Sequence, residues 1–482
     1  MQTTLDPTAA LDALHTANSA VSRSWPGDSS ARQPVHTVYG GAQLFKVGVH
    51  RKLGQLAVTV MDNYAPDFAT FARALGLAGA ETLPTRQADA DALATALRPL
   101  GEAGASVNEP AWRALMIYDR VRAKLEREAI EDQRIDFEDG YGHRRDDEED
   151  GHAVAAAAAL ADAMATGDLP PFIGIRIKPL TEESKRRSLR TLDLFLTALA
   201  GRSGGKVPAG FVVTLPKITH PGQVAVLADA LDALESALGF AAGAVGIDLM
   251  IETTQSIFDA EGRVVIPAMV AAGKGRVRSA AFGTYDYTAT CNITAAYQSH
   301  THSACDFARH VMQVSLAGTG VAMADGATTV MPIGPHRAGK GEQLSASQVA
   351  ENREVVFAAW KLHFDHITHS LAHGTYQGWD LNPGQLPVRY AAVYAFFMNG
   401  LRDASLRLDK FVAAASQATL VGNTFDDAAT GQGLLNYFLR GVACGALTEA
   451  EVLATGVTLD ELAGRSFARI VANRAHQRRD AV

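Results

Sequence analysis

The chain has 482 residues, of which 47% are hydrophobic and 20% are charged, and its 44 basic and 52 acidic residues leave a net charge of −8. This length exceeds one minimal domain, and the composition is that of a globular protein. The acidic balance argues against a nucleic-acid binder, which needs a basic surface.

Targeting signals are not evident in the sequence. Residues 1–24 are polar and Ala-rich and lack the charged-then-apolar pattern of a signal peptide. No apolar run reaches the roughly 18 residues of a membrane-spanning helix. The cysteines Cys291, Cys305 and Cys444 are scattered, which fits a reducing compartment without a disulfide framework or a zinc site. We therefore predict a cytoplasmic protein without a membrane-spanning helix.

Short β-rich apolar runs alternate along the chain with Ala- and Leu-rich stretches of helical character. Such alternation implies parallel strands joined by right-handed crossovers. Eight units without a Gly-rich phosphate fingerprint after the first strand favour a closed (β/α)8 TIM barrel. An open doubly wound sheet stays as the alternative. The predicted strands are residues 36–42, 134–138, 172–177, 211–215, 247–251, 279–283, 320–324 and 376–381, the first and last having the weakest pattern.

The spacing of these runs divides the chain into three parts. Residues 1–34 are a predicted N-terminal extension and residues 35–388 the barrel, whose first crossover is elaborated by helices over about 52–130. Residues 389–482 form a predicted C-terminal helical domain, with helices at 390–406 and 409–418 among others.

Acidic residues gather where the predicted strands end, which is the catalytic end of a parallel barrel. Burying ionised carboxylates is costly without a counter-charge, and only Arg176 and Lys217 are at hand. A divalent cation is the natural remaining partner, and oxygen ligands with open positions suit Mg²⁺ rather than Zn²⁺. The alternative is that these acids cap helices and form ion pairs. The acids are Asp136, Glu138, Asp139, Glu252 and Asp286.

An ordered series of short motifs resembles the malate synthase and citrate lyase β-subunit (HpcH/HpaI-like aldolase) superfamily, whose members are β/α barrels. The motifs are DFEDG, IRIKP, LPKI, IET, FGTYDYT and DLNPGQLP, in this order over roughly residues 130–390. Each motif alone is weak, and the ordered series is specific.

The resemblance implies roles for individual residues. Glu252 and Asp286 would hold Mg²⁺ (or Mn²⁺), and Arg176 would contact the substrate. The loop that contains Gly283, Thr284 and Tyr285 would offer N–H groups to the carboxylate of a 2-oxo acid. The remaining rim residues would support the metal, its waters or the substrate; they are Asp136, Glu138, Asp139 and Lys217.

A segment near the C-terminus, FDDAAT, resembles the malate synthase segment that carries the general base. The matching residue is Asp427, which would remove a proton from an acyl-CoA methyl group. Asp426 and Asp427 also precede an Ala-rich stretch, so a helix N-cap is the alternative role.

The resemblance implies a Mg²⁺-dependent carbon–carbon lyase or synthase that uses a 2-oxo acid such as glyoxylate and a coenzyme A thioester such as acetyl-CoA. Ile177-Lys178-Pro179-Leu180 replaces the Pro-Arg-Gly-Trp of malate synthases, so the 2-oxo acid stays open. The residues that bind coenzyme A, the direction of the reaction and a homo-oligomeric state are open as well. The alternatives are a coenzyme A-independent aldolase that forms a pyruvate enolate, a catalytically silent binding barrel and a phosphoryl-transfer enzyme.

Three histidines lie close together after the sixth predicted strand. His300, His302 and His310 occur in the stretch HTHSACDFARH, which resembles a metal cluster at first sight. We expect a surface helix here, because the stretch lies away from the catalytic ends of the strands.

Overall fold

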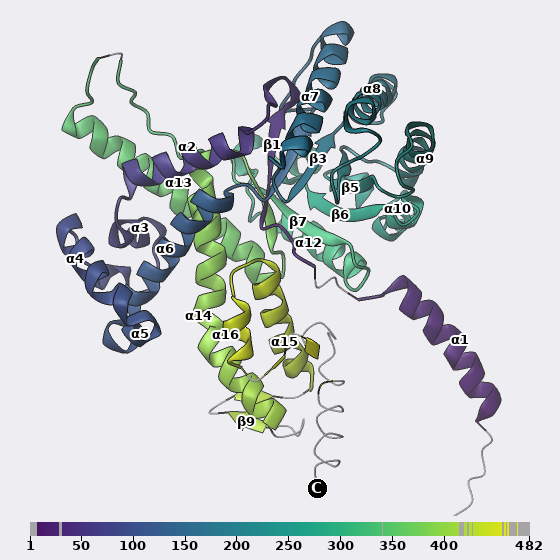
Figure 1. Cartoon of the computed structure of the whole chain (residues 1–482). Coiled ribbons are helices and arrows are strands. Elements are labelled where there is room, and N and C mark those ends of the chain that lie inside the picture. Colours follow the sequence, from purple (N-terminus) through teal and green to yellow (C-terminus); the bar gives the residue numbers. More distant parts are fainter. Residues whose placement is uncertain are drawn as a thin grey trace, which may run out of the picture.

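The protein is described by a computed structural model that covers residues 7–27, 31–339, 341–413, 419–421, 424–426, 428–455, 457–458, 460–461 and 470, with the backbone alone over 409–429. Eight parallel strands close a barrel in chain order (Figure 1). Closure brings the first strand beside the last, and His36 lies opposite Gly378. The strands are β1 (His36–Gly41), β2 (Asp132–Asp136), β3 (Phe172–Arg176), β4 (Val212–Leu215), β5 (Gly246–Ile251), β6 (Val277–Phe282), β7 (Ala322–Ala327) and β8 (Gln377–Asp380). The predicted TIM barrel is confirmed.

Helices alternate with the strands and surround the barrel (Figure 1). Left-handed glycines such as Gly167 and Gly239 end several of them, because only glycine adopts this conformation without strain. The helices are α7 (Asp146–Thr166), α8 (Lys185–Ser203), α9 (Pro221–Leu238), α10 (Ile266–Ala272), α11 (Thr284–Thr290), α12 (Ser303–Leu316) and α13 (Ala346–Ala372).

The first crossover is a helical insertion between β1 and β2. The Asp67 carboxylate caps its second long helix by accepting from the Thr70 N–H at 2.8 Å. Asn108 caps the last one, with Pro110 in the first turn, where a missing N–H costs nothing. The helices are α2 (Val49–Tyr64), α3 (Phe68–Leu75), α4 (Gln87–Leu97), α5 (Gly104–Val107) and α6 (Glu109–Glu128).

The C-terminal part is helical beyond the barrel. Its first helix, α14, runs without a break from Leu386 to Ala413, where the sequence pattern suggested two helices. The reason is that Arg407 and Leu408, between the two stretches, are both good helix formers. The other elements are β9 (Thr419–Val421), β10 (Thr424–Asp426), α15 (Ala428–Ala443) and α16 (Glu449–Leu453).

Two large apolar cores hold the described part of the molecule together. One lies between the barrel strands and helices α7 to α12. The other joins the first crossover to α13, α14 and α15, and buries Trp360, Tyr390 and Phe397. Arg120 on α6 contacts Glu451 on α16 at 2.6 Å. The crossover and the C-terminal helices therefore pack together beside the barrel.

The interior of the barrel is layered. Toward the ends of β1 and β8, the Tyr39 and Trp379 rings lie 4.3 Å apart. Toward the amino-terminal ends of the strands, Arg134 pairs with Asp132 and donates to Thr214 at 3.2 Å. At the carboxyl ends of the strands lies a charged rim. It consists of Asp136, Glu138, Asp139, Arg176, Lys217, Glu252 and Asp286. No helix in the described part of the chain is both long and apolar enough to cross a membrane.

Candidate active site

The loop after β2 anchors one side of the carboxyl rim. The Asp136 carboxylate accepts from the N–H groups of Glu138 at 3.0 Å and Gly140 at 2.7 Å. A Cβ at Gly140 would lie 2.5 Å from an Asp136 carboxylate oxygen, so this close approach requires glycine. The loop thus wraps around its own buried aspartate.

Arg176, at the end of β3, is held in a fixed orientation. Its Nε and Nη2 donate to Asp136 at 2.7 and 2.5 Å, and its Nη1 lies 3.0 Å from Glu138. The guanidinium also lies 4.6 Å from the Tyr39 ring and 5.4 Å from the Trp379 ring. Burial alone would lower the pKa of Arg176, but the bidentate Asp136 pair raises it, so this side chain stays charged.

Lys217, just after β4, links the acids of the rim. Its Nζ lies 2.5 Å from Glu138, 3.3 Å from Asp139 and 3.4 Å from Asp286. Burial lowers the pKa of the ammonium, and the carboxylates of Glu252 and Glu138 more than reverse this, so the net pKa is raised. One ammonium therefore faces three carboxylates.

The backbone of Lys217 is left-handed, with φ of 49°. This conformation costs a non-glycine residue on the order of 1 kcal/mol. It allows the Lys217 N–H to donate to Glu252 Oε1 at 2.7 Å. Local strain is thus kept where it orients a candidate metal ligand.

Glu252, after β5, is the most deeply placed acid of the candidate metal pair, with 2% of its surface exposed. Burial raises the pKa of Glu252 to about 8, and the nearby Asp286 and Glu138 carboxylates add to this while Lys217 opposes it. A Cβ at Gly283 would lie 2.4 Å from the Glu252 Cβ. Gly283 therefore allows β6 to approach the glutamate.

The first turn of α11, directly after β6, presents Asp286 to the opening, where the sequence predicted a loop. Its side chain is 42% exposed, in contrast to that of Glu252. Tyr285 fixes this turn by donating from its hydroxyl to the Ala327 carbonyl at 3.2 Å. The buried Thr284 hydroxyl has no hydrogen-bond partner among the described residues, so a polar atom is left available at the start of the helix.

The donor set of the rim fits a hard divalent cation. Five carboxylates face two cationic side chains, and the candidate ligands Glu252 and Asp286 provide only oxygen atoms. Among the described residues, no group of three or more His, Cys, Asp or Glu side chains is placed to hold a metal ion by itself. A site of two carboxylates completed by water or substrate is the arrangement that Mg²⁺ favours.

The structure connects most of the residues that the sequence indicated. Direct contacts join Asp136, Glu138, Asp139, Arg176, Lys217, Glu252 and Asp286. Tyr39 and Trp379, which enclose Arg176, were not predicted. The signal available was an aromatic residue near the end of both the first and the last strand, which closure of the barrel makes neighbours.

Asp427 lies outside the described residues. The helix that begins after it, α15, packs by its carboxyl end against the amino-terminal end of the barrel. There the Gln33 N–H donates to the Ala443 carbonyl at 3.3 Å and Arg440 donates to Gln33 at 3.2 Å. This contact lies at the opposite end of the barrel from Glu252.

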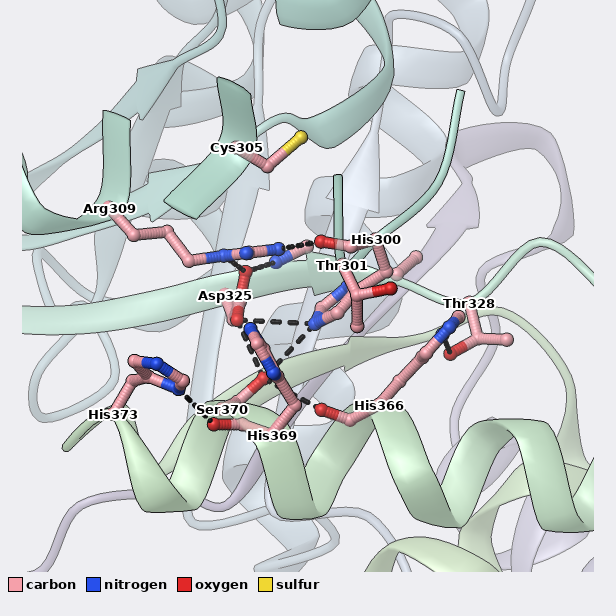
Figure 2. Close-up of polar contacts among 12 residues, drawn as sticks. His300, Thr301, Cys305, Arg309, Asp325, Thr328, His366, His369, Ser370 and His373 are labelled. Atoms are coloured by element: carbon pink, nitrogen blue, oxygen red, sulfur yellow. Dashed lines mark hydrogen bonds and ion pairs between the residues drawn. The ribbon is translucent and has the colours of Figure 1, made fainter. Parts of the chain in front are cut away.

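A second polar cluster lies behind β7, between α12 and α13 (Figure 2). Asp325 on β7 accepts from Arg309 at 2.7 Å and from the Ser370 hydroxyl at 2.6 Å, and its carboxylate lies 3.2 Å from His300. The expected surface helix is wrong for His300, which is 3% exposed. The reason is that α13 covers it, and its ring stacks on His366 at 4.9 Å.

This cluster continues toward the rim through shared side chains. The Thr328 hydroxyl lies 2.9 Å from Nδ1 of both His366 and His363. His363 Nε2 in turn lies 3.0 Å from Asp380, which also pairs with Arg389. The carboxylates of this cluster, Asp325 and Asp380, thus have hydrogen-bond and ion-pair partners within the protein.

An apolar cavity of about 220 Å³ lies beside the rim. It lies between β1, the start of α2 and the segment after β8. Gly41 and Asn382 border it where these strands end. The apolar lining residues include Val38, Phe45, Val49, Leu53 and Leu386.

Solved structures share the barrel. A citrate lyase of Burkholderia xenovorans LB400 is 18% identical, with 71% of this chain and 93% of that chain covered and a TM-score of 0.51. Protein CitE of Mycobacterium tuberculosis, in complex with magnesium, acetoacetate and coenzyme A, is 17% identical over 68% of this chain and 95% of that chain, with a TM-score of 0.43. A Haloferax volcanii malate synthase in a magnesium and glyoxylate complex is 12% identical over 91% and 99%, with a TM-score of 0.41.

The match to the citrate lyase confirms the expected superfamily resemblance at the level of the fold. No curated protein matches the chain. Residues 14–470 match the model of a family described as a domain of unknown function (DUF6986).

Proposed function

This chain belongs to the family described as a domain of unknown function (DUF6986), and we propose that it is a Mg²⁺-dependent carbon–carbon lyase or synthase acting on a 2-oxo acid and an acyl-CoA. The observation that carries the proposal is the uncompensated negative charge at the carboxyl rim, where buried Glu252 and half-exposed Asp286 lie beside Lys217. The ordered motifs that resemble malate synthase and citrate lyase support the same chemistry.

Glu252 and Asp286 would hold the ion. When bound, Mg²⁺ would supply Lewis-acid polarisation of the 2-oxo acid carbonyl. Arg176 donates two of its five N–H groups to Asp136, and its Nη1 forms an ion pair with Glu138 at 3.0 Å. Its remaining N–H groups would donate to an oxygen that becomes negative during carbon–carbon bond formation or cleavage. Because Asp136, Tyr39 and Trp379 fix the guanidinium, little reorganisation is needed.

The apolar cavity of about 220 Å³ beside the rim favours a coenzyme A thioester over pyruvate as the donor, because the single methyl group of pyruvate would leave most of it unfilled. If part of the acyl-CoA enters this cavity, Val49→Trp would fill the space that it needs. The substitution should therefore raise the KM for the acyl-CoA and leave the KM for the 2-oxo acid unchanged. Leu56→Trp is the matched control, since Leu56 lies on the same helix, is 44% exposed and does not line the cavity. Equal effects of the two substitutions would remove this argument.

The experiment that tests the function is a panel of 2-oxo acids against acyl-CoA thioesters with Mg²⁺, read as thiol release. We expect release that depends on both substrates and is lost after metal removal. Isothermal titration with acetyl-CoA and with pyruvate separates the proposed reaction from a coenzyme A-independent aldolase. Binding of pyruvate together with no binding of any acyl-CoA would overturn the proposal in favour of the aldolase.

We propose Asp427 as the base that deprotonates the donor, on the resemblance of its segment to malate synthase. Because α15 packs at the amino-terminal end of its own barrel, Asp427 could act in the active site of its own chain or in that of another copy. A mixture of the Asp427→Asn and Glu252→Gln variants, each expected to be inactive alone, distinguishes the two cases. Recovery of activity on mixing would mean that base and metal come from different chains, and no recovery would mean that they come from one. Retained donor proton exchange in Asp427→Asn alone would show that the base is another residue.

A further inference from the structure

The first helix, α1 (Thr8–Ser24), carries an apolar stripe that no described part of its own chain covers. None of its residues is buried. Leu11, Leu14, Val21 and the following Trp25 are each more than half exposed. Their spacing places them on one face of the helix. In proteins most of the stability of a helix comes from packing its apolar face against a neighbour, so this face favours a partner.

A second exposed stripe lies on α12. Phe307 and Val314 are 52% and 80% exposed, and half-buried Val311 lies between them. Phe258 extends this surface, its ring lying 6.1 Å from that of Phe307. Exposed valine and phenylalanine at helical spacing are typical of an interaction surface.

The two stripes match in length and spacing. At 1.5 Å per residue, α1 and α12 are about 26 and 21 Å long. Leu14 and Val21 are seven residues apart, and so are Phe307 and Val314. Side chains of the two helices can therefore meet in pairs along their length.

The position of α1 directs it away from its own α12. Trp25 lies against Gly318, just beyond the end of α12, and the Gly27 N–H donates to the Gly318 carbonyl at 2.8 Å. Figure 1 shows α1 leaving the body of the protein beside the end of α12 and pointing outward. A two-fold axis near this junction would lay the α1 of each copy along the α12 of the other, which is a closed, isologous contact.

We propose that two copies of this chain exchange α1, which packs in parallel on the partner subunit's α12, with Leu14 beside the partner's Phe307 and Val21 beside the partner's Val314. This contact is independent of the proposed enzymatic activity. It makes the protein a homodimer whose N-terminal helices are ordered by association.

Disulfide trapping tests the proposal directly on the full chain. The double variant Val21→Cys/Val314→Cys should give a cross-linked species of twice 51.0 kDa, or 102 kDa, under oxidising, non-reducing conditions. The single variants control for the native cysteines and should stay monomeric in the gel. The double variant Val21→Cys/Val355→Cys is the matched control, because Val355 is 39% exposed on α13. A cross-link within one chain would overturn the proposal and assign α1 to its own α12.

The mass in solution gives a second, independent measurement. We expect 102 kDa for the wild type by light scattering, and 51.0 kDa for Val314→Glu. Adding Val21→Lys to Val314→Glu should restore the dimer through an ion pair. A monomeric wild type, or a dimer that Val314→Glu leaves intact, would overturn the proposal. Binding of the monomer to phospholipid vesicles would assign the stripe to a membrane surface instead.

Discussion

The carboxyl rim of the barrel and the buried cluster behind β7 contain the same kinds of side chain, but their carboxylates are in different electrostatic states. At the rim, Asp286 is half exposed and Glu252 has a raised pKa. In the cluster, burial would raise the pKa of Asp325, but the neighbouring His300 and Arg309 more than offset this, so the pKa is lowered. The same holds for Asp380, where Arg389 and His363 offset burial.

The difference lies in how the negative charge is compensated. Asp325 accepts from Arg309, Ser370 and the Gly326 N–H and lies near His300, so its charge is satisfied by the fold. At the rim, five acids share two cations. A charge that the fold satisfies stabilises it, and a charge that the fold leaves unsatisfied can bind a ligand.

The largest expected effect of a single substitution is on activity at the rim. Glu252→Gln should lower the Mg²⁺-dependent rate by about 10³-fold, because loss of metal polarisation removes several kcal/mol of transition-state stabilisation. Thermal stability should be unchanged or higher, since a neutral amide is easier to bury. Initial rates of thiol release and thermal melts measure the two effects. Glu261→Gln is the control, as this exposed acid pairs only with Arg263 among the described residues. A wild-type metal-dependent rate in Glu252→Gln would exclude Glu252 as a ligand.

In the buried cluster the effect should fall on stability. Asp325→Asn leaves the buried guanidinium of Arg309 without its main partner and should cost about 3–5 kcal/mol of unfolding free energy. Urea denaturation measures it. Asp306→Asn removes a half-buried partner of the same arginine and should cost about 1 kcal/mol or less. If both variants lose the same small amount, the cluster does not stabilise the fold in the way described.

The buried histidines predict a loss of stability in mild acid. Burial lowers the pKa of His36 to about 4 and that of His366 to about 3, whereas in the unfolded chain each titrates near 6.5. From pH 6.5 down to about 4 these two histidines bind more protons in the unfolded state, so each makes unfolding easier as the pH falls, whereas Glu252, with its pKa raised to about 8, acts in the opposite direction. The slope approaches roughly 1.4 kcal/mol per pH unit for each histidine. Asp325 and Asp380 have lowered pKa values, so the stability that their ionised carboxylates contribute is lost only at a pH below this window.

Urea midpoints between pH 7 and pH 4.5 measure this slope. In His36→Asn the dependence of unfolding free energy on pH should decrease by the contribution of one histidine, at most roughly 1.4 kcal/mol per pH unit. An unchanged slope would mean that His36 is protonated in the fold.

The smallest effect concerns the backbone at the rim. In Gly283→Ala the new Cβ would meet the Glu252 Cβ at 2.4 Å, so the glutamate must shift. We expect about tenfold weaker Mg²⁺ binding and about 1 kcal/mol lower stability. Isothermal titration with Mg²⁺ measures the first. Gly201→Ala, on α8, has no atom within 4 Å of its new Cβ and should be neutral or slightly stabilising. Wild-type affinity in Gly283→Ala would show that Glu252 does not need this close approach.

The sequence alone determined the barrel and most of its rim. Each strand is a short apolar run, and the side chains after parallel strands meet at one end of the barrel whatever their separation in the chain. For this reason Arg176, Lys217, Glu252 and Asp286 could be assigned to one site from local patterns and ordered motifs.

Tertiary structure alone decided the rest. Tyr39 and Trp379 enclose Arg176 because closure pairs β1 with β8, residues that are 340 positions apart. His300 is buried because Ser370, 70 residues later, returns on α13 to cover it. The position of α15 at the amino-terminal end of the barrel depends on the direction in which α14 leaves the rim. A local pattern tells which face of an element is apolar, but the partner of that face is chosen only when distant parts of the chain pack together.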